Sequence, residues 1–223
     1  MHSPTRPFDS ATATRIASAY LPPHPFGNRW DYYYTRAKLG SEPLYQGVLN
    51  ALRGSQAPVQ DLGCGLGLLA HALHLDGQTM TYRGVDNDAA KIMRATRVAG
   101  KNALHEVQFE VVDLAQGPPA HAGSVAILDV LQYLSAAEQA RLVSDAIATL
   151  TPGARLVIRT ALGDESRRGR TSRITDRLAN WIGWMQFRPK CYPDADALRT
   201  QLEAAGLGTS FRRCTAIRPS TTG

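Results

Sequence analysis

The 223-residue sequence predicts an α/β fold with a doubly wound, mostly parallel sheet. Strand-like and helix-like segments alternate from residue 57 onward, which is typical of parallel strands joined by helices. A glycine-rich loop, Asp61-Leu62-Gly63-Cys64-Gly65-Leu66-Gly67, follows the first of these strands and precedes a helix. Asp86 ends the second strand, 25 positions after Asp61. A ribose-binding carboxylate is expected at about this spacing in a nucleotide-binding βαβ unit.

The elements of the main domain follow from the pattern of apolar residues. Strands are predicted near residues 57–61, 80–86, 106–112, 124–129 and 154–159, and helices near residues 67–76, 88–100 and 135–149. In such a sheet the ligand lies outside the carboxyl ends of the strands.

Residues 1–53 are predicted to form an N-terminal arm and lid in front of the main domain, residues 54–223. Residues 1–28 are rich in proline, serine and threonine, and we expect an irregular arm there. The aromatic and basic segment 28–39 leads into an amphipathic helix over residues 41–52.

The C-terminal third departs from the regular alternation. An insertion at about residues 161–190 has an arginine-rich entry, and apolar spacings of three and four predict a helix in its second half. Residues 194–205 predict another helix, and residues 208–217 a possible sixth strand. The few residues after that are poor strand formers, so the final hairpin is predicted to be shortened.

The glycine loop has the properties of a cofactor loop. Glycines let the backbone turn and approach a ligand closely, and the following helix N-terminus offers free N–H groups. Glycine clusters also mark ordinary turns, which is the alternative interpretation. Asp61 would repel a pyrophosphate but not a cationic ligand. Cys64 is interpreted as a small side chain that the loop requires, with a reactive thiol as the alternative.

Four motifs occur in a recognisable order: the glycine loop, Val111-Val112-Asp113-Leu114, the segment 125–134 and the segment 150–158. On these motifs the chain resembles class I, Rossmann-like methyltransferases that depend on S-adenosylmethionine (SAM). The resemblance implies SAM as the cofactor. It implies cofactor contacts at Tyr34, Arg36, Asp61, Gly63, Cys64, Gly65, Asp86, Asn87, Asp113, Leu114 and Asp129.

Three acids follow strands, and each has a structural alternative. The resemblance implies that Asp86 contacts the ribose, although a helix cap is also expected at this turn from Asn87 or Asp88. It implies that Asp113, or the Leu114 backbone N–H, contacts adenine, although Asp also commonly ends a strand. Asp129 either faces the methyl donor or is a structural acid bonded to nearby amides.

The segment before the sheet has two interpretations. Tyr33, Tyr34, Arg36 and Lys38 form either a solvated face with tyrosines on the core, or a lid over the cofactor. In the lid, aromatic rings cover the sulfonium and Arg36 pairs with the methionyl carboxylate.

A narrower resemblance is carried by residues 34–45, Asp129 to Leu134, and Arg159. It is to small bacterial methyltransferases encoded with fatty-acid-like and polyketide-like synthases, notably in aryl polyene pigment pathways. That group commonly has a His directly before the Tyr of its post-strand motif, where this chain has Gln132 before Tyr133. If that His is the general base of the group, this chain needs another base, and the candidates are Asp129, Tyr133 and Tyr33.

The net charge of +6 points to an acidic partner, and five arginines fall within residues 167–177. We expect methylation of a small hydroxylated aromatic or polyene- or lipid-like acceptor, free or bound to an acyl carrier protein. One alternative is an RNA methyltransferase, which the lack of an added binding domain argues against. A second alternative is a non-catalytic SAM-binding partner subunit.

The remaining composition excludes several classes. The three cysteines have no CxxC or Cys/His spacing, so no metal site is predicted. The N-terminal residues lack an apolar run fit for a signal peptide or a membrane span, and a cytoplasmic protein is expected.

Overall fold

The computed structural model describes residues 6–24, 26–162 and 189–212, and all structural statements below concern these residues. They contain a parallel sheet of five strands in the order β3-β2-β1-β4-β5. The strands are β1 (Val59–Leu62), β2 (Tyr82–Asp86), β3 (Val107–Val111), β4 (Ser124–Leu128) and β5 (Leu156–Arg159). Each lies within two residues of its predicted bounds. The predicted doubly wound α/β fold is confirmed.

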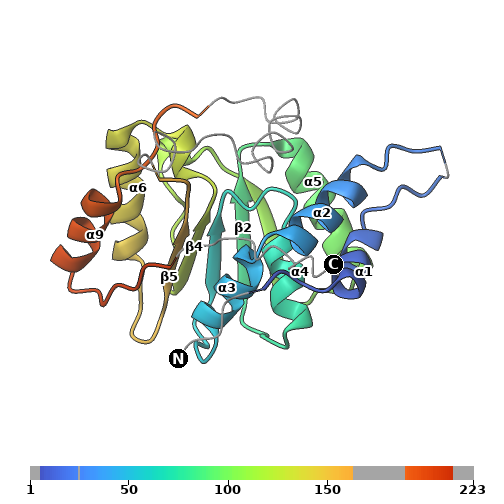
Figure 1. The fold of residues 1–223 in the computed structure, drawn as a ribbon, viewed down its shortest axis with the longest axis horizontal. Coiled ribbons are helices and arrows are strands. Elements are labelled where there is room, and N and C mark those ends of the chain that lie inside the picture. Colours follow the sequence, from blue (N-terminus) through green and yellow to red (C-terminus); the bar gives the residue numbers. More distant parts are fainter. Residues whose placement is uncertain (1–5, 25, 163–188, 213–223) are drawn as a thin grey trace, which may run out of the picture.

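Helices cover both faces of this sheet (Figure 1). On one face lie α4 (Leu68–Leu75), α5 (Ala89–Lys101) and the N-terminal helices α1 (Ser10–Ser18), α2 (Trp30–Ser41) and α3 (Leu44–Leu52). On the other face lie α6 (Ala136–Ala148) and α9 (Ala195–Ala204). Two short 3₁₀ turns, η1 (Leu114–Gln116) and η2 (Leu131–Tyr133), follow β3 and β4. The apolar core is accordingly divided into one cluster on each face.

Capping side chains fix the first turns of α5 and α6. Asp88 caps α5, because its carboxylate accepts from the N–H groups of Ala90 and Lys91. Ser135 and Glu138 form a reciprocal capping box at the start of α6. These caps fix the turns that directly follow β2 and η2, at the carboxyl edge of the sheet.

The prediction of an irregular arm over residues 1–28 is wrong for Ser10–Ser18, which form α1. The Asp9 carboxylate accepts from Thr12 N at 2.9 Å and so starts the helix. Ala13, Ile16 and Ala17 are buried against the core, and this burial offsets the entropy lost when the segment becomes helical. The flanking prolines led to the prediction of irregular structure, although the cap and the apolar spacing of a short helix are both present in the sequence.

The C-terminal predictions are tested only in part. The predicted helix over 194–205 is confirmed as α9. Most of the predicted insertion, with its arginine-rich entry and helix, lies outside the described residues. Residues 208–212 form no strand, and the rest of the predicted sixth strand lies outside the described residues.

Helix α2 extends from α5 to the carboxyl end of β4. Near its start, the Asp31 carboxylate lies 3.5 Å from Arg94 Nε of α5. Near its end, Lys38 Nζ lies 3.1 Å from the Asp129 carboxylate, just after β4. Helix α2 therefore contacts both α5 and the carboxyl end of β4. Among the described residues, no helix has the length and apolar character needed to cross a membrane.

Candidate active site

The glycine loop is bent back onto β2. The backbone N–H groups of Gly63 and Cys64 both donate to the Val85 carbonyl, at 2.8 and 2.9 Å. Gly63 has a φ of +85°, and a Cβ there would collide with the Val130 side chain. Gly65 has a φ of +55°, but the space where its Cβ would stand is open. Glycine is thus required at 63 by packing, whereas at 65 it leaves bare backbone facing open space.

Asp86 fixes the loop in this position. Its Oδ2 accepts from Gly65 N at 2.9 Å and its Oδ1 accepts from Asp88 N at 2.9 Å. The acid that was predicted to contact the ribose therefore lies against the glycine loop, at the carboxyl end of β2. Asn87 beside it is exposed. Ligand contacts of both residues stay predictions.

Asp61 is a buried acid without a cationic partner among the described residues. Its side chain is 2% exposed, and its Oδ2 accepts from the Tyr82 hydroxyl at 2.6 Å. Its Oδ1 is buried and makes no hydrogen bond. Burial raises the pKa of Asp61 to about 7, the Tyr82 hydrogen bond opposes this rise, and the charge of Asp86 adds to it. An unpaired buried carboxylate is costly, so a cationic group at this position would be stabilising.

These features fit SAM. The open backbone at Gly65 accommodates close approach of a ligand, and the lone oxygen of Asp61 matches its positively charged methionine end. Burial raises the pKa of the Cys64 thiol well above its usual value, which keeps it protonated and favours the packing interpretation over a reactive thiol.

A cluster of four charges lies at the carboxyl ends of β4 and β5. This four-charge cluster consists of Lys38, Glu42, Asp129 and Arg159. The Asp129 carboxylate accepts from Lys38 Nζ through Oδ2, at 3.1 Å, and from Arg159 Nη1 through Oδ1. Glu42 pairs with the same two cations, at 3.3 Å from Lys38 and 3.8 Å from Arg159. Two anions and two cations therefore balance one another.

Asp129 is held there by its backbone as well. Its φ is +60°, a conformation that residues other than glycine adopt rarely and that recurs at functional sites. Its N–H donates to the Arg159 carbonyl at 2.9 Å, and its carbonyl accepts from Gln132 Nε2 at 3.0 Å.

Lys38 remains positively charged in this cluster. Burial by itself lowers its pKa, but the nearby Tyr34, Glu42 and Tyr45 raise it to about 12. The pKa of the Tyr34 hydroxyl is raised, chiefly by burial, so it is neutral at physiological pH. Burial likewise raises the pKa of the half-buried Tyr133. The site therefore has two neutral phenols beside a fixed cation.

Gln132 acts as a structural link. Its Nε2 donates to the Asp129 carbonyl, while its Oε1 accepts from the Thr160 hydroxyl at 3.2 Å. Its backbone carbonyl accepts from Lys190 N at 2.8 Å. Both ends of the amide are in use, so the residue that stands in place of a His joins the end of β4 to the end of β5.

Other predicted residues lie apart from this cluster. Tyr33 is 54% exposed and packs edge-on against Tyr32, with the ring centroids 5.1 Å apart. Arg36 is exposed on α2 and has no hydrogen bond or ion pair with the described residues. Asp113 is exposed and accepts from Ala115 N at 3.0 Å, as a turn-capping acid does, while Leu114 packs against the core.

Lys38 and Glu42 were not predicted to be site residues. With Tyr34 they recur at every fourth position, so they share one face of α2. Arg36 lies half a turn away from that face. The spacing of four was the signal that could have selected Lys38 over Arg36.

Comparison with known proteins agrees with the fold. The sequence matches the family described as "Methyltransferase domain" over residues 54–177, which is more than half of the chain. A search of curated proteins gives no match.

Three solved structures share the fold at low identity. The magnesium protoporphyrin IX methyltransferase of Synechocystis PCC 6803, with bound SAH, has a TM-score of 0.61 and 19% identity over 95% of this chain and 90% of its own. An O-methyltransferase family protein from Burkholderia thailandensis has a TM-score of 0.59 and 20% identity over 82% of this chain. The pyocyanin biosynthetic protein PhzM has a TM-score of 0.57 and 16% identity over 85% of this chain. The chain spans 55% of the length of each of these last two proteins.

The sheet order, the glycine loop and the sequence match agree with one another. The chain belongs to the methyltransferase domain family, and its fold is that of class I methyltransferases.

Proposed function

We propose that the enzyme transfers a methyl group from SAM to a small hydroxylated aromatic or polyene- or lipid-like acceptor, free or bound to an acyl carrier protein. Its setting is bacterial secondary metabolism, with aryl polyene biosynthesis as the leading pathway. The observation that carries the proposal is the four-charge cluster around Asp129, at the strand end where the methyl group is expected. Two structural neighbours, an O-methyltransferase family protein and a pyocyanin biosynthetic protein, are compatible with a small acceptor.

Asp129 is proposed as the general base. When bound, SAM supplies a methyl group attached to a positively charged sulfur. The proton of the acceptor hydroxyl passes to the Asp129 carboxylate. The acceptor oxygen then forms its bond to the methyl carbon as the carbon–sulfur bond breaks, and the electron pair of that bond stays on sulfur. Tyr133 and Tyr33 are the other candidate bases; the raised pKa of Tyr133 and the exposure of Tyr33 both favour Asp129.

The two cations of the cluster are proposed to act on the acceptor oxyanion. Lys38 and Arg159 carry two positive charges against the two negative charges of Glu42 and Asp129. Once Asp129 has accepted a proton, the cluster has one net positive charge. That charge stabilises the acceptor oxyanion at the moment it forms, because the two cations are already fixed in place.

The cofactor site is proposed to lie between the glycine loop and α2. Asp61, Gly63, Cys64 and Gly65 are proposed to hold the methionine end, and Asp86 with Asn87 the ribose. Asp113 and Leu114 are proposed to border the adenine, and Tyr34 the sulfonium. In this arrangement residues 1–53 act as arm and lid, since α2 reaches from α5 to β4.

The test is transfer of a labelled methyl group from SAM to three kinds of acceptor: free phenolic acids, hydroxyaryl groups on an acyl carrier protein, and bulk tRNA. We expect label in a phenolic acceptor, in the free or the carrier-bound form, and an equal amount of S-adenosylhomocysteine (SAH). Asp129→Asn serves as the inactive control, with SAH binding measured to show that its cofactor site is intact. Label in tRNA alone would contradict the proposal.

A further inference from the structure

A pocket of about 540 Å³ lies on the flank of α5, away from the four-charge cluster. Its lining residues come from the segment between α1 and α2, from the start of α2 and from α5: Tyr20, Pro22, Pro23, Asn28, Trp30, Asp31, Arg94 and Arg97. None of them belongs to the glycine loop or to the acids at the strand ends. The volume is in the range of sites that take small organic molecules.

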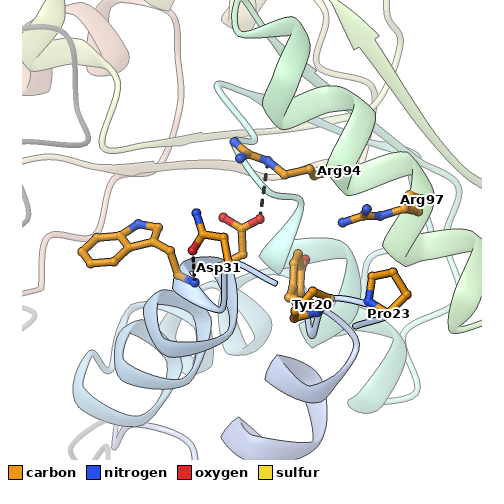
Figure 2. A pocket seen from close by; sticks show the side chains of 8 residues that line it. Tyr20, Pro23, Asp31, Arg94 and Arg97 are labelled. Atoms are coloured by element: carbon orange, nitrogen blue, oxygen red, sulfur yellow. Dashed lines mark hydrogen bonds and ion pairs between the residues drawn. The ribbon is translucent and has the colours of Figure 1, made fainter. Parts of the chain in front are cut away.

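The polar side of the pocket has an excess of positive charge. Figure 2 shows Arg94 and Arg97 extending from α5 towards Asp31 and Tyr20. Asp31 pairs with Arg94 at 3.5 Å, so one of the two guanidinium charges is balanced. Arg97 has no hydrogen bond or ion pair with the described residues. Two arginines against one aspartate leave a net charge of +1 in the lining.

The apolar side is formed by Tyr20, Pro22, Pro23 and Trp30, and the Tyr20 ring is held in a fixed position. The Tyr20 hydroxyl donates to the Leu66 carbonyl at 2.7 Å, and its ring packs edge-on against His71 with the centroids 5.8 Å apart. Trp30 is fixed at its backbone, where its N–H donates to Asn28 Oδ1 at 2.8 Å. Rigid aromatic and proline walls bind a flat apolar body at little cost in conformational entropy.

We propose that this pocket is a second ligand site, separate from the cofactor site, for a small aromatic carboxylate. The carboxylate lies on the planar guanidinium of Arg97, which can donate two parallel hydrogen bonds to it. The ring of the ligand packs against Tyr20 and Trp30. This goes beyond the proposed function, because the site does not require its ligand to be the methyl acceptor.

The pocket and the cofactor loop share one contact. The Leu66 carbonyl that accepts from Tyr20 belongs to the glycine loop itself. Ligand and cofactor therefore bind at adjacent but different surfaces, and both are expected to be bound at once.

The experiment is calorimetric titration of the whole chain with 4-hydroxybenzoate, and with the neutral 4-hydroxybenzyl alcohol as the matched probe. We expect saturable binding of the acid with a Kd at or below about 1 mM, and at least about tenfold weaker binding of the alcohol. Arg97→Gln should weaken binding of the acid by about tenfold or more while SAH binding is retained. Arg15→Gln removes the same charge from the exposed face of α1 and should leave the affinity unchanged.

Two further measurements make the result decisive. Raising the salt concentration should weaken binding of the acid to the wild-type protein but not that of the alcohol, which tests the charge without any substitution. Binding of the acid should persist when SAH is saturating. The proposal is overturned if the acid fails to saturate, if it binds as well to Arg97→Gln as to the wild type, or if SAH displaces it. None of these results depends on methyl transfer, so the failure of this proposal and that of the proposed function are distinguishable.

Discussion

Two aspartates mark the carboxyl ends of neighbouring strands, Asp61 in β1 and Asp129 after β4, and their surroundings are opposite. Asp61 is 2% exposed, faces no cation among the described residues and has one oxygen without a hydrogen bond. Asp129 has a cation on each of its oxygens, Lys38 and Arg159. The chain itself neutralises the acid on the side proposed for the acceptor. On the cofactor side it leaves the acid for a ligand to neutralise.

The largest effect is expected for Asp129→Asn. The amide cannot take a proton from the acceptor and pairs only weakly with Lys38 and Arg159, so kcat should fall by about a thousandfold. The measurement is single-turnover methyl transfer with SAH affinity determined in parallel. Asp196→Asn is the control, because Asp196 is an exposed acid on α9 with no role in the proposed site. A kcat within a few-fold of the wild type would exclude Asp129 as the base.

Asp61→Asn should weaken cofactor binding and raise the stability of the ligand-free protein. The amide can still accept from the Tyr82 hydroxyl but offers no charge to the cofactor, so SAH should bind about 10- to 100-fold more weakly. At pH 8 the ligand-free variant should melt roughly 5 °C higher than the wild type, because no buried charge remains. Lower stability together with unchanged SAH affinity would show that Asp61 has only a structural role.

A pair of substitutions on α2 tests which cation the site uses. Lys38→Gln removes a buried partner of Asp129 and Glu42, and we expect kcat/KM to fall by about tenfold and Tm to decrease. Arg36→Gln removes the same charge from the exposed face of the helix, and we expect less than about a twofold change. If Arg36→Gln instead weakened SAH binding strongly, the prediction that Arg36 pairs with the methionyl carboxylate would hold.

The smallest effect is on the pH dependence of SAH affinity. The pKa of Asp61 near 7 means that the ammonium group of SAH has to displace its proton at lower pH. Affinity should therefore fall by about threefold between pH 7.5 and 6.5, and Asp61→Asn should abolish this dependence.

The same pKa has a consequence for the stability of the ligand-free protein. Its value in the folded state lies above the ordinary 3.8, so the folded state binds this proton more tightly than the unfolded chain does. The contribution of Asp61 to stability is fully present below pH 4 and is lost as the pH rises through 7. Melting temperatures of the wild type and of Asp61→Asn should accordingly diverge over this interval.

The sequence was sufficient for the sheet because the apolar runs of its strands are short and bounded by glycines or acids. It was not sufficient to predict α1. Prolines on both sides favoured irregular structure, although Asp9 caps the helix and Ala13, Ile16 and Ala17 are spaced so that they share its buried face. It also did not distinguish Lys38, which pairs with Asp129, from Arg36, whose cofactor contact stays a prediction. Both residues are cations in the same segment. Only the spacing of four from Tyr34 along the helix places Lys38 towards Asp129. Whether Asp61 finds a counter-ion within the chain depends on tertiary packing, which a local pattern does not contain.

Helix α2 connects α5 to the carboxyl end of β4. It is anchored through Asp31 to α5 and through Lys38 to the end of β4, and these two residues lie about 10 Å apart along the helix axis. Both ion pairs are largely buried, so salt screens them little. Removal of either pair by substitution loosens the same helix, and the backbone amides of α2 should then exchange with solvent at rates that rise together.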